Sequence, residues 1–107
     1  MNHAAALPHL HDLPPLDPSD AACMAELQAV LARHGKASRF GVGLLHRHFA
    51  LADHERLVET VDETTRTLTV RPVEADALPE AKPSQWQLTP DGPQPILWCY
   101  DKLGPHA

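Results

Sequence analysis

The sequence predicts an α+β fold, with an N-terminal arm and one helix followed by a curved, meander-like antiparallel sheet of five strands. Three observations lead to this prediction. Apolar residues recur at helical spacing in one segment near the N-terminus, later segments alternate between polar and apolar residues, and short turn-rich connections separate the alternating runs. Short connections between strands favour antiparallel pairing. A chain of 107 residues is expected to form one domain.

Charge and composition exclude several classes of partner. The chain has 9 Lys and Arg against 14 Asp and Glu, which gives a net charge of -5. No basic stripe is present, so we expect no nucleic-acid binding. No apolar run approaches the roughly 20 residues of a membrane helix, and no signal peptide is recognisable. Cys23 and Cys99 are far apart in the sequence, so we expect a cytoplasmic protein with reduced thiols and no membrane partner.

The first 17 residues form a proline-rich arm, with a C-terminal tail expected over 102–107 and the α+β domain between them, over 18–101. Leucines occur at every third position of the arm, which would line one edge of a polyproline II helix. Such an arm could lie across its own domain, lie across a partner subunit or be disordered. The leucines are Leu7, Leu10, Leu13 and Leu16.

A helix is predicted over 18–34. Asp17 can cap its N-terminus, Pro18 suits the first helical position and Asp20 favours the positive end of the helix dipole. Gly35 is placed to end it. The apolar positions at helical spacing are Cys23, Met24, Leu27, Val30 and Leu31.

Five strands are predicted after the helix. Residues 55–61 could also form a short helix capped by Asp53, but their β-branched content favours a strand. Residues 67–73 would pair back on them as a hairpin, and Pro-Asp-Gly-Pro marks the last turn. The predicted strands are 39–49, 55–61, 67–73, 85–88 and 96–100.

The first predicted strand, residues 39–49, would carry Phe40, Val42 and Leu44 on one face. Gly41 and Gly43 would lie on the other, which indicates close packing there, for example by the helix. One helix about 10 Å wide cannot cover five strands spaced about 4.8 Å apart. The remaining apolar surface must be covered by the arm, by closure into a barrel or by a second subunit. The sequence therefore favours a homodimer, or a barrel that holds a small-molecule ligand.

His46 and His48 are the leading site candidates. On a strand, residues two apart point the same way, so both imidazoles could bind one divalent transition metal, such as Zn, Fe or Ni. One alternative is that they are ordinary polar residues at a strand end, because eight histidines make such pairs common by chance. Another is a metal-free role as a general base or an anion contact. The candidates for further ligands are His54 and Glu55, followed by Glu59, His9 and His11.

A second candidate surface is aromatic. Trp98 and Tyr100 would share a face of the last strand, with Trp86 on the strand paired with it. They could form a pocket wall or a dimer interface, or simply pack across the sheet. Arg47, between the two histidines, is added to these interface candidates.

The predicted function is therefore a small, soluble, non-enzymatic binding or interaction domain that self-associates. The alternative is a metal-binding protein or a metal-dependent enzyme that uses the His46/His48 pair. In that case a metal-bound water would be the nucleophile or the exchangeable ligand.

Overall fold

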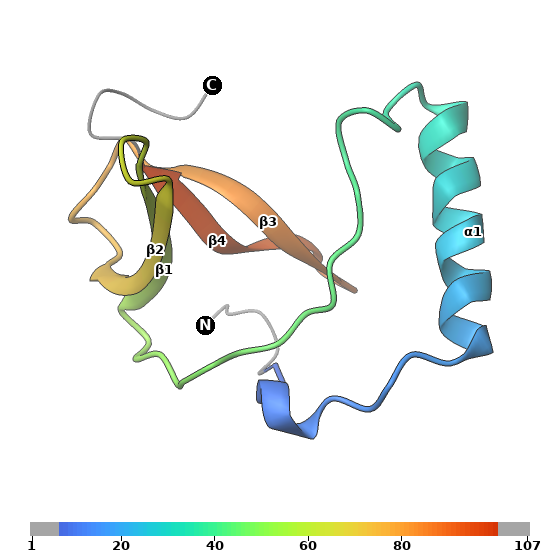
Figure 1. Ribbon diagram of the computed structural model, residues 1–107, viewed down its shortest axis with the longest axis horizontal. Coiled ribbons are helices and arrows are strands. Elements are labelled where there is room, and N and C mark those ends of the chain that lie inside the picture. The colour runs from blue at the N-terminus through green and yellow to red at the C-terminus, as the bar shows by residue number, and fades with distance from the viewer. Residues whose placement is uncertain (1–6, 101–107) are drawn as a thin grey trace. The chain divides into compact units, whose positions relative to one another are not determined.

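A computed structural model describes residues 7–100 and divides the chain into two units (Figure 1). The first, Pro8–His48, is called the helical unit below. The second consists of the residues before Pro8 and those from Phe49 onward, contains all four strands and is called the sheet unit. The predicted α+β class is confirmed. No helix of the described range is long and apolar enough to cross a membrane.

The helix α1 runs from Pro18 to Arg33, close to its predicted bounds. Its N-terminus is a reciprocal capping box. Asp17 accepts a hydrogen bond from the Asp20 backbone N–H at 3.1 Å, and Asp20 accepts one from the Asp17 N–H at 2.8 Å. Hydrogen bonds from the Ser19 hydroxyl and the Asp20 N–H lower the pKa of Asp17 below its ordinary value. After α1, Gly35 adopts a φ of 68°, which favours glycine because it has no side chain.

The arm does not form a continuous polyproline II helix. A short 3-10 helix, η1, spans Leu10–Asp12 and interrupts the extended backbone on which the leucine spacing depends. The arm is held through backbone hydrogen bonds from Leu10 N to Arg47 O and from Arg47 N to Pro8 O, which form an isolated parallel bridge at His9 and Arg47. Residues 1–6 and the predicted tail at 102–107 lie outside the described range.

The predicted strand at 39–49 is absent, and that prediction was wrong. Residues 40–46 follow an irregular path with no ladder partner (Figure 1). No backbone hydrogen bond joins residues 41–45 to any other described residue. The expected close packing at the two glycines is also absent, because a Cβ added at Gly41 or Gly43 would meet nothing within 4 Å. A strand needs a neighbour for its backbone groups, and alternation alone does not provide one.

The sheet unit contains four strands rather than five. The first hairpin and the second hairpin are each antiparallel, and strands β1 and β4 pair in parallel at the centre. The order across the sheet is β2-β1-β4-β3. The strands are β1 (Glu55–Asp62), β2 (Thr67–Glu74), β3 (Lys82–Thr89) and β4 (Gly92–Tyr100). The choice of a strand over a short helix at 55–61 is therefore confirmed.

The mixed pairing corrects the predicted antiparallel meander, and the sheet is open rather than barrel-like. The cause is the connection from β2 to β3. Residues 75–81 carry the chain across the sheet, so β3 forms the far edge and its hairpin partner β4 returns beside β1. Short loop length predicts antiparallel neighbours only when successive strands are adjacent in the sheet, and β2 and β3 are not.

Both edge strands carry a proline, Pro72 in β2 and Pro83 in β3. Proline donates no backbone hydrogen bond, and on an edge strand it discourages pairing with another chain. The two interruptions in the β3–β4 register, at Pro83/Gln85 and at Gln85/Trp86, distort the second edge further. Addition of a strand at either edge of this sheet is therefore disfavoured.

Three apolar residues form the buried core of the described chain: Val58, Ala81 and Cys99. All belong to the sheet unit. Val58 is fully inaccessible, and Ala81, at the end of the crossover loop, is 8% exposed. No residue of the helical unit is buried, including the apolar positions of α1. The two units therefore differ sharply in how much of their stability can come from internal packing.

Candidate functional site

His46 and His48 lie together at the surface of the helical unit. Their ring centroids are 4.9 Å apart and the ring planes meet at 84°. The Nδ1 atom of His46 lies 2.7 Å from the carbonyl oxygen of Leu44. A carbonyl only accepts, so Nδ1 carries the proton and Nε2 of the neutral ring keeps its lone pair. The same tautomer is found in metal-bound histidines, whose second nitrogen donates to a carbonyl.

The structure brings the other His-x-His pair, His9 and His11, to the same segment through the bridge at Arg47. The Nε2 atom of His9 lies 3.0 Å from the His48 carbonyl oxygen, and its Nδ1 accepts from the His11 backbone N–H at 3.2 Å. Both nitrogens of His9 are thus engaged. The His9 and His11 rings stack, with centroids 4.8 Å apart. His9 therefore fixes the backbone of His48 rather than offering a ligand of its own.

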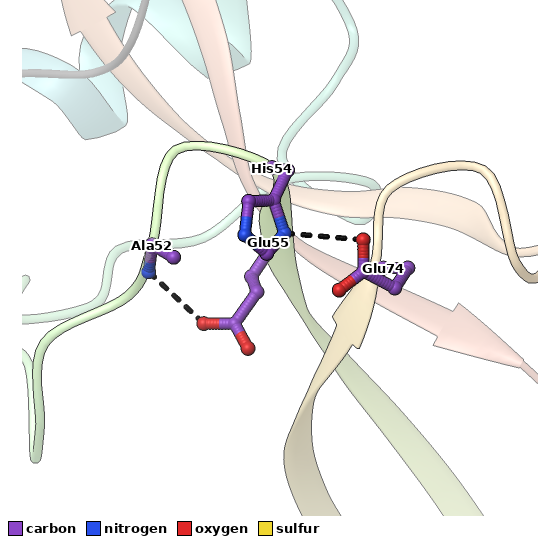
Figure 2. Close-up of polar contacts among 4 residues, drawn as sticks. All are labelled: Ala52, His54, Glu55 and Glu74. Atoms are coloured by element: carbon purple, nitrogen blue, oxygen red, sulfur yellow. Dashed lines mark hydrogen bonds and ion pairs between the residues drawn. The ribbon is translucent and has the colours of Figure 1, made fainter.

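His54 and Glu55, predicted as further metal ligands, are engaged in local contacts of the sheet unit (Figure 2). The Nδ1 atom of His54 lies 3.1 Å from an oxygen of Glu74, which joins the start of β1 to the end of β2. Glu55 accepts a hydrogen bond from the Ala52 backbone N–H at 2.9 Å. Within residues 7–100, no three His, Cys, Asp or Glu side chains form a group able to hold a metal ion.

A polar cluster that the sequence did not reveal surrounds Cys99. The Cys99 thiol lies 3.2 Å from Oε1 of Glu59 and 3.3 Å from the hydroxyl of Ser84. Three strands supply these residues, with Glu59 and Cys99 directly paired by the parallel register of β1 and β4. Burial raises the pKa of the Cys99 thiol, and the adjacent Glu59 carboxylate raises it further, while Ser84 acts in the opposite direction. Cys99 is therefore held as a neutral thiol.

The two cysteines should differ in reactivity, because Cys23 is exposed and Cys99 is buried. We expect a thiol reagent at neutral pH to label Cys23 at least about tenfold faster than Cys99, since the thiolate is the reacting form. Labelling of Cys99 should accelerate as the pH rises towards its raised pKa. Mass spectrometry of the labelled peptides measures both rates, and labelling in denaturant is the control that should remove the difference. Equal rates in the folded protein would contradict the assigned burial.

The predicted aromatic surface is organised around Arg56 rather than around a pair of tryptophans. The guanidinium of Arg56 lies 4.7 Å from the centroid of the Trp98 ring. Its Nη2 also donates to the Leu78 carbonyl oxygen at 3.3 Å. Arg56 thus fastens the crossover loop to the two central strands. The contact between Arg56 and Trp98 is difficult to predict from the sequence, because it exists only when β1 and β4 are neighbours in the sheet.

The remaining interface candidates are dispersed. The β3–β4 register pairs Trp86 with Pro95 and Trp98 with Pro83, so the two tryptophans are not cross-strand partners. Trp86 is 38% exposed on the edge strand, whereas Tyr100 is half-buried at the end of β4. Arg47 belongs to the helical unit, where its backbone holds the arm. Trp86, Trp98 and Tyr100 belong to the sheet unit, so the four candidates are divided between the two units.

The described residues therefore present two chemical features: a surface pair of imidazoles in the helical unit, and a neutral, buried thiol cluster in the sheet unit. The first suits ligation of a cation. The second suits packing, because a protonated thiol is a poor nucleophile. Comparison with protein-family models, curated proteins and solved structures gives no match to this chain.

Proposed function

We propose that this protein is a non-enzymatic interaction domain that self-associates, and that its helical unit carries the contact surface. The observation that supports this most directly is the absence of any buried residue in Pro8–His48. Units of about 40 residues or fewer usually need disulfides, metals or oligomerisation to be stable. Both described cysteines are free, so no disulfide between them supplies this stabilisation, and we infer that a partner does.

The contact surface is the segment 40–45 together with the apolar positions of α1, which are Cys23, Met24, Leu27, Val30 and Leu31. Phe40, Val42 and Leu44 are exposed by 46%, 59% and 54%. Their alternation is that of a strand with one apolar face, and within the described range residues 41–45 make no backbone–backbone hydrogen bond. An unpaired segment of this kind is a template for pairing with another chain.

The occupant is a second copy of the same segment. An alternating apolar face is self-complementary, so two copies related by a two-fold axis can pair their backbones and pack their apolar side chains against each other. The edges of the sheet, which carry prolines, offer no competing route. In α1, Met24 and Val30 are 40% and 39% exposed and would be covered by the same assembly, because an isolated helix of 16 residues is marginal in water.

The test is the molar mass of the untagged full chain by analytical ultracentrifugation over a range of concentrations. We expect a dimer in the wild type and a monomer in Val42→Asp and Leu44→Asp, since a buried, unpaired carboxylate is strongly unfavourable. Leu88→Asp is the matched control, because Leu88 is 75% exposed in the sheet unit and should not affect association. A wild type that stays monomeric at every concentration, with and without added divalent metal, would overturn the proposal.

A further inference from the structure

His46 and His48 place two imidazole rings side by side in the helical unit. The protonated Nδ1 of His46, held by the Leu44 carbonyl, leaves Nε2 as the donor. The ring of His48 lies beside it, with centroids 4.9 Å apart. Two imidazoles bound to one zinc ion at tetrahedral angles have ring centres about 5 Å apart, given Zn–N bonds of about 2.0–2.1 Å. The observed pair already has this spacing.

The same chain does not complete the site. A structural zinc ion takes four protein ligands, and no third His, Cys, Asp or Glu is grouped with this pair among residues 7–100. His9 is brought to this segment by the bridge at Arg47. Both of its ring nitrogens are used in hydrogen bonds, one to the His48 carbonyl oxygen and one from the His11 backbone N–H. His54 and Glu55 serve the contacts at the start of β1.

We propose that a divalent zinc ion bridges two copies of this chain, bound by His46 and His48 of each. A two-fold axis near this pair doubles two imidazoles to four, which is the number of ligands in a closed tetrahedral site, and imidazole is a ligand that zinc accepts. His46 follows directly on the exposed apolar segment, so the axis that pairs residues 40–45 can also bring the histidines of two copies together. This inference rests on the proposed self-association, and it adds that zinc regulates the association.

A site of this kind has a structural role. All four positions on the metal are filled by imidazoles, so no position remains for a bound water or a substrate. Metal binding then contributes directly to the free energy of association, because the complete site exists only in the dimer. The chain would assemble when zinc is available and dissociate when it is removed.

The experiment measures molar mass and bound zinc together on the untagged full chain. Protein treated with EDTA and dialysed is examined by analytical ultracentrifugation before and after addition of zinc, and bound metal is counted by mass spectrometry. We expect zinc to produce a dimer with one ion per two chains, and EDTA to return it to monomer. His46→Ala and His48→Ala should each abolish the response, with circular dichroism confirming that α1 persists. His11→Ala and His34→Ala are the matched controls and should behave as wild type.

The other outcomes separate this inference from the proposed function. A dimer that persists in EDTA and holds no zinc would overturn the metal bridge while supporting self-association. One zinc ion bound per monomeric chain would overturn the bridge, and loss of that binding in His11→Ala would assign the third ligand within the chain. A monomer in every condition that binds no zinc would overturn both.

Discussion

Val58→Ala should lower the free energy of unfolding of the sheet unit by about 2–3 kcal/mol. Val58 is the only fully inaccessible side chain in the described range, and it lies on β1 opposite Arg71 of β2 and Trp98 of β4. Removing its two methyl groups loses their burial and leaves a cavity that the two neighbouring strands can fill only in part. Small domains have a total stability of only about 5–15 kcal/mol, so this loss is large.

Urea unfolding followed by tryptophan fluorescence measures the effect, because both tryptophans lie in the sheet unit. Val70→Ala is the matched control. Val70 occupies the adjacent edge strand and is 43% exposed, so its truncation should cost less than about 1 kcal/mol. Val58→Asp should prevent folding of the unit altogether, because it buries an unpaired carboxylate. Equal effects of Val58→Ala and Val70→Ala would contradict the assignment of Val58 as the centre of the core.

Arg56→Ala should destabilise the sheet unit by about 2 kcal/mol. The side chain makes two contacts at once, a cation–π contact with Trp98 and a hydrogen bond to the Leu78 carbonyl. Loss of the guanidinium leaves that partly buried carbonyl without its donor and detaches the crossover loop from β4. Arg56→Lys should recover only part of the stability, since an ammonium lacks the planar stacking surface of arginine.

The readout is again urea unfolding followed by tryptophan fluorescence. Arg71→Ala provides the matched control, because Arg71 is an exposed arginine on the adjacent strand and should have an effect within about 0.5 kcal/mol. A loss of stability in Arg71→Ala as great as in Arg56→Ala would show that charge, rather than the contacts with Trp98 and the loop, is responsible.

In the candidate site, the contact between neighbouring residues could be predicted from the sequence, whereas the contacts made across the fold could not. The pairing of His46 with His48 is a local feature, and the two rings do lie together. The ligand candidates His54 and Glu55 are close to this pair in sequence. In the structure, His54 contacts Glu74 across the β1–β2 ladder, and Glu55 accepts a hydrogen bond from the turn at Ala52. The bridge that brings His9 and His11 to the same segment spans almost the whole helical unit. No periodicity predicts a contact of that length.

The sequence by itself determined the features that depend on neighbouring residues. The cap at Asp17 and the glycine at position 35 predicted the start and end of α1. Alternation with turn residues predicted both hairpins, although β3 and β4 each begin three or four residues earlier than predicted. The tertiary structure alone decided which strands are neighbours. The crossover loop placed β4 beside β1, made the sheet mixed and assembled the contacts of Val58, Arg56 and Cys99. The tertiary structure also left the segment 39–49, a strand by pattern, outside the sheet. A strand depends on a second chain segment for its hydrogen bonds, whereas a helix satisfies its own, so the helix could be predicted locally and this strand could not.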